Sequence, residues 1–241
     1  FNLLKICFSL VATAAKAQPN LSQSIAFSAQ GGFIGQPSPP DGLKCLAGTD
    51  LKANLQASLG RAVALASPGQ ALALYESRFG AAKDSAVACT LYLDNHVFGG
   101  VTFGRKLWRG ANRIVGAWGH TPLAWPVSHE LDGRDCWCGR SGCLDCFLSL
   151  GGLETEYHNI TQTRLDIKAI AAAADASDLV ASSVLQVLDD RIGRTTAMII
   201  NMFAPDVIIL GGRLASLYRL YQNVPRKWPG YLLVDRNKTK L

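Results

Sequence analysis

Cys136-Trp-Cys-Gly-Arg-Ser-Gly-Cys143 is the stretch of this sequence that decides its fold. It holds three cysteines in eight residues, Leu144-Asp145 follows it, and Gly119-His120 precedes it along the chain. Thiolates at this density, with glycines that let the backbone bend around a common centre, are typical of a tetrahedral zinc site. The sequence therefore predicts a metal centre of three cysteines and one histidine, whose ligands are His120, Cys136, Cys138 and Cys143.

Two alternatives for the ligand set stay open. Cys146 forms a Cys-x-x-Cys pair with Cys143, and this pair could complete a site of four cysteines in place of His120. His129 competes for the histidine position. A disulfide framework is disfavoured, because the total of seven cysteines is odd and their spacing is irregular.

Composition places the chain among folded globular proteins. With 49% hydrophobic and 17% charged residues in 241, it can form one large domain or two smaller ones. The 24 Lys and Arg residues exceed the 18 Asp and Glu residues, but the net charge of +6 is scattered. Because nucleic-acid binders show basic stripes interleaved with aromatic residues, we expect no nucleic-acid partner. A mildly basic surface suits a small phosphorylated ligand.

Membrane and export signals are weak. No apolar run reaches the length of a membrane span, so we expect a soluble, cytoplasmic protein that does not bind membranes. Residues 1–17 combine Lys5, an apolar stretch and Ala15-Lys-Ala17, which resembles a signal-peptide cleavage site. Apolar residues in this segment also recur at helical spacing, which favours an amphipathic core helix.

Helix and strand signals alternate along the rest of the chain. Strands are expected at residues 62–66, 87–93, 99–103 and 207–210. Helices are expected at residues 50–59, 70–79, 169–174, 184–203 and 214–221. Gly211-Gly212 follow the last strand, where glycines let a ligand's phosphate approach the backbone or simply form a tight turn.

Three motifs together resemble the ROK family of sugar kinases and repressors, and within it the bacterial fructokinases. They are Gly116-Ala-Trp-Gly-His120-Thr-Pro, the cysteine stretch with Leu144-Asp145, and Asn201-x-x-x-Pro205-Asp-Val-Ile-Ile-Leu-Gly-Gly212. The resemblance extends over roughly residues 22–240, and the cysteine motif with its Gly-His is its most specific part.

The resemblance implies an α/β fold of the actin-like ATPase (ribonuclease H-like) type, whose two domains close over ATP and a hexose. In such kinases an aspartate takes the proton of the attacking sugar hydroxyl, and Mg²⁺ assists. The zinc is then structural and shapes the loop 119–146, with His120 and Asp145 beside the sugar and Gly211-Gly212 beside the nucleotide. The expected domains are 1–91, a remnant of the N-terminal domain, and 92–241. A homodimer is suggested by analogy.

The chain departs from the family pattern where catalysis is carried. Pro68 stands at the position of the catalytic aspartate, and proline has no group that accepts a proton. The second phosphate loop, Gly-Thr-Gly in the pattern, aligns with Asp94-Asn-His96, which places a carboxylate against an anion. Two sugar-binding residues of the pattern correspond to Ala47 and Ala117. A third corresponds to Asp145, which keeps a carboxylate or else caps the following helix.

These departures predict a fructokinase-type sugar kinase that has little or no activity. The pattern's first phosphate loop and its closing helix have no counterpart, so the chain is expected to be incomplete at both ends. The alternative is a non-catalytic, zinc-stabilised domain that binds a sugar or a partner, or a relic. A zinc-ribbon nucleic-acid module is disfavoured, because only one cysteine cluster is present.

The other histidines and tryptophans receive structural roles. His96 and His158 show no partner pattern and are expected at the surface. Trp118, Trp125 and Trp137 are expected to pack the zinc loop rather than to stack on a sugar.

Overall fold

The computed structural model describes residues 24–28, 50–60, 62–131, 133–234 and 236–241. The chain forms two compact units, which divide between Pro68 and Gly69. The boundary expected after residue 91 falls within strand β3 (Val87–Leu93), which pairs along its whole length, so residues on both sides of that boundary share one sheet. The helix predicted within residues 1–17 and the position Ala47 lie outside the described residues.

The first unit contributes a short βαβ segment. Its described elements are β1 (Ser24–Ser28), α2 (Leu51–Leu59) and β2 (Ala62–Ala66), and the two strands pair in parallel. The Asp50 carboxylate caps α2 by accepting a hydrogen bond from the Ala53 N–H at 2.9 Å. Gly60 ends the helix in the left-handed region, at φ 61°. The helix and the strand expected here are confirmed.

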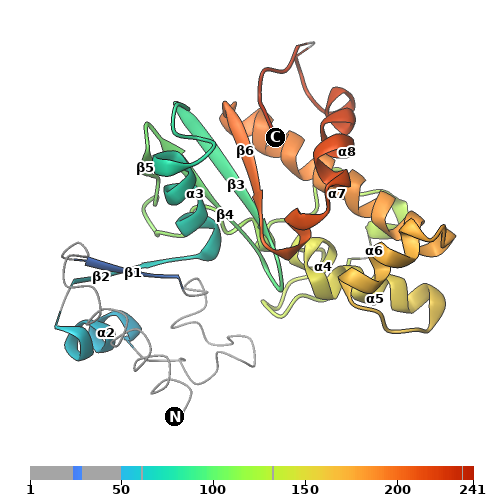
Figure 1. Ribbon diagram of the computed structural model, residues 1–241, viewed down its shortest axis with the longest axis horizontal. Helices are drawn as coiled ribbons and strands as arrows, with labels where there is room; N and C mark the ends of the chain where they lie inside the picture. The colour runs from blue at the N-terminus through green and yellow to red at the C-terminus, as the bar shows by residue number, and fades with distance from the viewer. Residues whose placement is uncertain (1–23, 29–49, 61, 132, 235) are drawn as a thin grey trace. The chain divides into compact units, whose positions relative to one another are not determined.

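The second unit is built on a mixed four-stranded sheet (Figure 1). Across the sheet the strands follow the order β5 (Lys106–Leu107), β4 (Val97–Phe103), β3, β6 (Val207–Gly211). β3 and β4 form an antiparallel hairpin, whereas β3 and β6 run parallel. The carboxyl ends of β3 and β6 therefore meet at one edge of the sheet.

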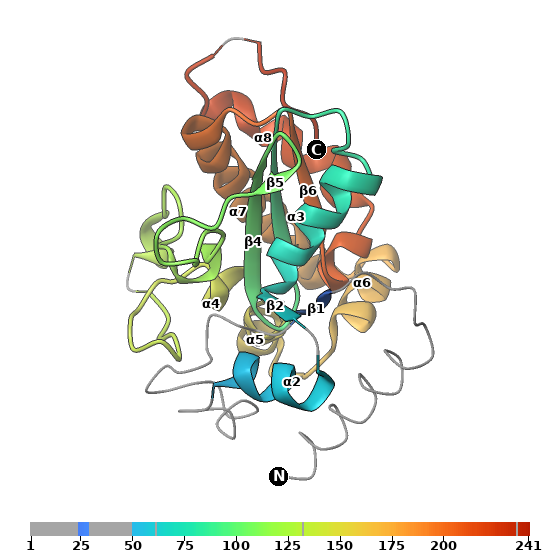
Figure 2. The ribbon, with the colours of Figure 1, turned by 90° about the vertical axis from the view of Figure 1, so that its left-hand side faces the viewer.

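Helices cover both faces of this sheet (Figure 2). Helix α3 (Pro68–Phe79) lies over one face, and helix α7 (Leu179–Phe203) lies over the other. Thr90 of β3 faces α3 and donates its hydroxyl to the Gly69 carbonyl at 2.8 Å. The neighbouring side chains on β3 point to the opposite face, as strand alternation requires. Those buried in the main core are Cys89, Leu91 and Leu93.

The start of α3 lies against the sheet because two glycines meet there. A Cβ atom on Gly69 would lie only 2.4 Å from the Cα of Gly99 on β4. The helix begins at Pro68, earlier than the expected residue 70. Proline suits the first helical position, because its missing N–H would have no partner in the helix there.

The remaining helices begin at the end of the loop 119–146, which we call the cysteine loop. They are α4 (Asp145–Leu148), α5 (Leu150–Thr161), α6 (Ile167–Asp175), α7 and α8 (Arg219–Lys227). The helix expected at 214–221 is wrong in extent: the extended backbone of Leu217 separates a short 3-10 turn, η5 (Arg213–Ser216), from α8. No single helix in the described ranges is long and apolar enough to cross a membrane, although α6 and α7, bent by 114°, pass that test as a pair.

Helix α7 carries charged side chains into the interior, where they form what we call the buried ion network. Glu130, 1% exposed, binds Arg191 at 2.7 Å and Arg194 at 2.9 Å. Arg191 also binds Glu156 of α5, which in turn binds Arg134 at 2.9 Å. Burial alone would raise the pKa of Glu130, but hydrogen bonds from Arg194 and Arg191 hold it at about 2. The network joins the loop 119–146 to α5 and α7.

We expect Glu130→Gln to lower the free energy of unfolding by about 3–5 kcal/mol, because two buried guanidinium groups lose their shared carboxylate. Urea unfolding at pH 7, followed by circular dichroism, measures the loss. Asp190→Asn is the matched control: its carboxylate also binds Arg194 but is 33% exposed, so its loss should stay below about 1 kcal/mol. A loss below about 1 kcal/mol in Glu130→Gln as well would contradict a stabilising role for Glu130.

The same carboxylate makes stability depend on pH. The pKa of Glu130 falls from an ordinary value of 4.5 to about 2 in the folded chain. Its contribution is therefore complete above pH 4.5 and is lost as the pH falls towards 2. Across that interval we expect the unfolding free energy of the wild-type protein to fall more steeply than that of Glu130→Gln, measured by urea titrations at several pH values. Parallel curves would contradict the assignment.

Candidate functional site

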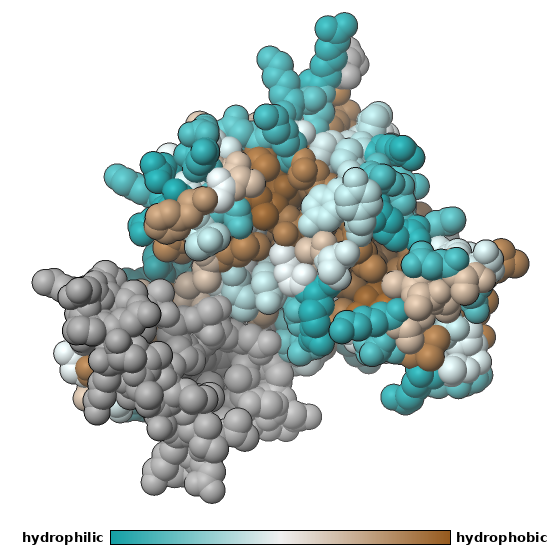
Figure 3. Space-filling model, in the orientation of Figure 1, coloured by the Kyte–Doolittle hydropathy of each residue, from teal (hydrophilic) through white to brown (hydrophobic). Residues whose placement is uncertain are grey.

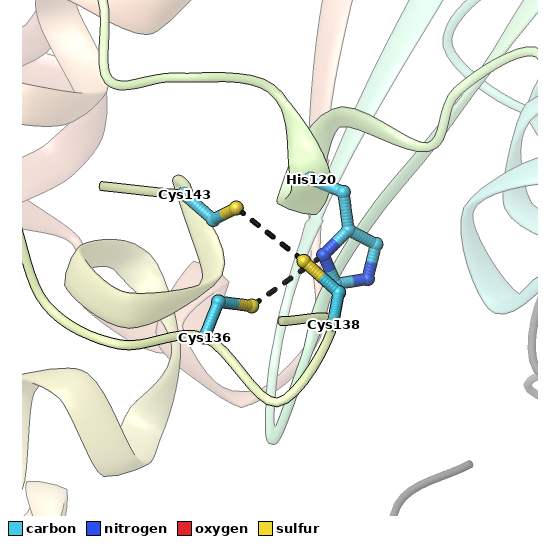
Figure 4. A group of neighbouring side chains, drawn as sticks. All are labelled: His120, Cys136, Cys138 and Cys143. Atoms are coloured by element: carbon cyan, nitrogen blue, oxygen red, sulfur yellow. Dashed lines mark hydrogen bonds between the residues drawn. The ribbon is translucent and has the colours of Figure 1, made fainter. Parts of the chain in front are cut away.

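The four predicted ligand side chains converge on one point (Figure 4). The ligand atoms of His120, Cys136, Cys138 and Cys143 all lie within 4.8 Å of one another. Cys138 Sγ lies 3.7 Å from Cys143 Sγ, and Cys136 Sγ lies 3.6 Å from His120 Nδ1. Tetrahedral zinc, with bonds of about 2.3 Å to sulfur and about 2.05 Å to nitrogen, requires separations of about 3.8 Å and about 3.6 Å respectively. The arrangement can therefore hold a tetrahedral metal ion.

Backbone geometry brings these ligands together. The 3-10 turn η3 (Trp118–His120) presents His120. Gly139 and Gly142 adopt φ of 85° and 74°, the left-handed region that glycine enters readily, and so reverse the chain between Cys138 and Cys143. Isolated antiparallel bridges close the loop, and they join Pro122 to Cys143 and Asp135 to Ser141.

The two alternative ligands lie outside the cluster. Cys146 is on α4, and its Sγ is directed at the Asp135 carbonyl, 3.6 Å away. His129 lies on the short turn η4 (Ser128–Glu130) and is exposed. Neither belongs to the group of converging ligand atoms. The geometry thus favours His120 as the fourth ligand.

Protonation in the cluster makes the binding of a cation depend on pH. Burial lowers the pKa of His120, so its imidazole is neutral at pH 7, the form that ligates metals. Burial raises the pKa of the Cys136 and Cys143 thiols. Burial alone would also raise the pKa of Cys138, but hydrogen bonds, including one from the Arg140 backbone, lower it. A metal that binds here must displace thiol protons, so its affinity should rise with pH.

Asp145 lies buried beside the cluster, and both of its carboxylate oxygens have partners. Its Oδ1 accepts a hydrogen bond from the Val97 N–H at 2.6 Å, and its Oδ2 accepts one from Trp137 Nε1 at 3.2 Å. Oδ2 also lies 2.9 Å from His96 Nδ1. The alternative in which Asp145 caps the following helix is wrong, because its carboxylate joins the cysteine loop to the β3–β4 turn. The expectation of an unpartnered surface His96 is wrong for the same reason.

The other aromatic residues of this region differ in their surroundings. Trp118 is buried and donates Nε1 to the Thr90 carbonyl at 3.0 Å, as expected of a packing residue. Trp125 is 45% exposed and packs against Tyr231, with ring centroids 5.0 Å apart. His158, expected at the surface, is half-buried, and its Nδ1 has no hydrogen-bond partner in the part of the chain that the structure describes.

An ion pair joins the carboxyl ends of β3 and β6. Asp94 follows β3, and it accepts hydrogen bonds from Arg213 Nη2 at 2.6 Å and from the Arg213 backbone N–H at 3.0 Å. Arg213 Nη2 also donates to Asn95 Oδ1 at 2.7 Å. Burial alone would raise the pKa of Asp94, but the hydrogen bonds from Arg213 hold it below its usual value. The carboxylate is therefore ionised and paired at neutral pH.

The two glycines at the end of β6 allow the tight turn that brings Arg213 to Asp94. Gly212 adopts φ 81°, and a Cβ atom there would lie 2.2 Å from the Leu93 carbonyl oxygen. Its conformation directs the Arg213 N–H at Asp94. A Cβ atom on Gly211 would lie 2.4 Å from the Leu72 side chain of α3. The tight-turn explanation of Gly211-Gly212 therefore has direct support from packing.

The structure also places the two positions, Pro68 and Ala117, at which the chain lacks a carboxylate of the family pattern. Pro68 is the first residue of α3. Glu76, the next carboxylate after it in the sequence, accepts a hydrogen bond from the Ala81 N–H at 2.8 Å beyond the end of α3. Ala117 is exposed and directly precedes η3.

Comparison with curated proteins finds sugar kinases. An N-acetyl-D-glucosamine kinase of Vibrio atlanticus is 30% identical over 195 residues, which cover 77% of this chain and 63% of the relative. The N-acetylgalactosamine kinase AgaK of Shewanella sp. is 28% identical over 190 residues, which cover 78% and 62%. The chain thus spans 62–63% of the length of these relatives.

Solved structures share the fold. A ROK hexokinase from Thermus thermophilus matches with a TM-score of 0.72 at 24% identity, over 81% of this chain and 64% of that one. A ROK family transcriptional regulator, a homologue of the E. coli MLC protein, matches with a TM-score of 0.77 at 21% identity, over 99% and 63%. The predicted α/β fold of the actin-like type is confirmed. Since the ROK family model matches residues 34–240, this protein belongs to the ROK family.

Proposed function

We propose that this protein is a ROK protein of the sugar-kinase type, with a structural zinc loop and a hexose-binding region but little or no phosphoryl transfer. The observation that carries the proposal is a contrast between two regions. The ligand atoms of the proposed zinc cluster converge within 4.8 Å. By contrast, Pro68 stands where the family pattern has its catalytic aspartate, and Ala117 stands where it has a sugar-binding glutamate. Three protein thiols and one imidazole complete a tetrahedron and leave no open position for water or substrate, which supports a structural role for zinc.

We expect the protein to bind about one equivalent of zinc and to lose it in Cys138→Ala or Cys143→Ala, because each variant removes a ligand. Metal content after dialysis and competition with a chromophoric chelator measure this. Cys146→Ala is the matched control and should retain the metal. Affinity should be higher at pH 8 than at pH 6.5, because the thiols must lose protons. Zinc retained by His120→Ala but lost by Cys146→Ala would instead support the site of four cysteines.

The proposed loss of catalysis follows from the groups that phosphoryl transfer needs. A general base contributes roughly 10²- to 10⁴-fold in rate, and Pro68 offers none. At the edge formed by β3 and β6, the Arg213 guanidinium is already paired with Asp94, so it offers little net attraction to a phosphate. ATP and Mg²⁺ would be the phosphoryl donor and its metal by family resemblance. Here Asp94 places a negative charge where phosphates would have to approach.

The sugar itself is proposed only as a hexose. The motifs resemble those of fructokinases, whereas the curated relatives are named for N-acetyl-D-glucosamine and N-acetylgalactosamine. Fructose and N-acetyl-D-glucosamine therefore both belong in any test. Asp145 and His120 are the proposed neighbours of the sugar. The homodimer, the cytoplasmic location and the absence of a nucleic-acid partner stay predictions from the sequence.

A coupled assay with ATP, Mg²⁺ and either fructose or N-acetyl-D-glucosamine should show no phosphorylation above background. The physical reason is the missing base at Pro68 together with the altered phosphate loop. A catalytically competent ROK kinase assayed in parallel validates the coupling system. Clear turnover by this chain with either sugar would sink the proposal of impaired catalysis.

A thermal-shift series tests binding without requiring catalysis. We expect a hexose to raise the melting temperature and ATP with Mg²⁺ to leave it unchanged, because the sugar side keeps Asp145 while the phosphate edge is altered. Ala117→Glu restores a carboxylate at an exposed position and should enlarge the shift given by the sugar. Stabilisation by ATP would contradict the proposed loss of nucleotide binding. A lack of response to every ligand would favour the relic.

A further inference from the structure

A cavity of about 380 Å³ lies where α8 packs on α7, and none of its lining residues belongs to the metal centre. The two helices lie side by side in both ribbon views (Figures 1 and 2). In the space-filling view, teal hydrophilic side chains gather over this part of the molecule (Figure 3). A cavity of this size is typical of small-molecule sites. Its lining is mainly polar and cationic, and it consists of Gln186, Asp189, Arg219, Asn223, Arg226 and Lys227.

Asp189 lines this cavity, and one of its two carboxylate oxygens is buried and unsatisfied. The side chain is 3% exposed, and its Oδ2 accepts hydrogen bonds from Arg219 Nη2 and Asn223 Nδ2, both at 2.8 Å. Its Oδ1 is buried and has no hydrogen-bond partner among the described residues. An unpaired buried acceptor costs about 1–3 kcal/mol, more when it is charged. A ligand that donates a hydroxyl hydrogen to Oδ1 would remove this cost.

The cavity also carries positive charge without a counter-ion. Arg219 is paired with Asp189, whereas Arg226 and Lys227 make no salt bridge within the described ranges. Both side chains are exposed. Gly193 of α7 permits a close approach here, because a Cβ atom on it would lie 2.6 Å from the Lys227 Cβ. Two cations thus line the same cavity as Asp189, the residue that holds the unsatisfied oxygen.

We infer that this cavity binds a small phosphorylated polyol, with its phosphate on Arg226 and Lys227 and a hydroxyl donated to Asp189 Oδ1. Arginine and lysine together suit a phosphate, through charge-assisted hydrogen bonds. The favourable interaction of cations with the carboxyl end of α8 explains why basic residues occur there. It does not explain the unsatisfied oxygen in the same cavity, which a hydroxyl-bearing anion does. The inference is independent of the proposed kinase chemistry.

Isothermal titration calorimetry on the full chain at low ionic strength tests this site with glycerol 3-phosphate as the probe. We expect saturable binding of glycerol 3-phosphate, weaker binding of inorganic phosphate and none of glycerol. The double variant Arg226→Ala/Lys227→Ala should weaken binding by about tenfold or more. Arg164→Ala/Lys168→Ala is the matched control, because it removes two exposed cations outside the cavity, and it should bind within about twofold of the wild type.

Asp189→Asn tests the hydroxyl contact separately. It should reduce the preference for glycerol 3-phosphate over inorganic phosphate, and a melting curve checks that the variant folds, because Arg219 loses its charged partner. If the variant unfolds, the Arg226→Ala/Lys227→Ala comparison still decides. Three results would overturn the inference: no saturable binding, equal weakening in the control variant, or glycerol binding as tightly as glycerol 3-phosphate. None of these readouts depends on turnover of ATP.

Discussion

The carboxylate of Glu130, buried between Arg191 and Arg194, holds the cysteine loop against the longest helix of the described chain. Charges buried at this depth are stable only when each has its partner, so the loop and α7 depend on each other for position. On its other side the loop is held by Asp145, whose carboxylate binds the backbone at Val97 and the side chain of His96 in the β3–β4 turn. The cluster of sulfur and imidazole atoms thus shapes a loop that is anchored to both the sheet and the helices.

The edge where β3 and β6 end keeps its regular fold, although the residues there differ from the family pattern. There β3 and β6 pair in parallel, and Asp94 and Arg213 bind each other across the edge. A paired guanidinium in a partly solvated position attracts a further anion only weakly. The fold does not require the proposed catalytic groups, because packing and hydrogen bonding sustain the sheet without them.

Cations are used in two different ways in the second unit. Arg191, Arg194 and Arg213 each bind a carboxylate of the chain itself, and their charge stabilises internal contacts. Arg226 and Lys227 border a cavity and make no such pair among the described residues. The difference in pairing, rather than the number of basic residues, distinguishes a structural cation from one available to a ligand. The net charge of the sequence cannot show this difference, because it counts paired and unpaired cations alike.

The sequence by itself determined the four candidate metal ligands and the α/β alternation, because ligand spacing and hydrophobic period are local properties that can be read from neighbouring residues. The family followed from the resemblance of three motifs. Only the tertiary structure decided which partners meet across long separations. His96 pairs with Asp145, Glu130 with the two arginines of α7, and Asp94 with Arg213. Cys146, which competed with His120 for the fourth ligand position by spacing, is directed at the Asp135 carbonyl instead. These outcomes depend on which loop folds back onto which strand or helix, and no local spacing encodes that choice.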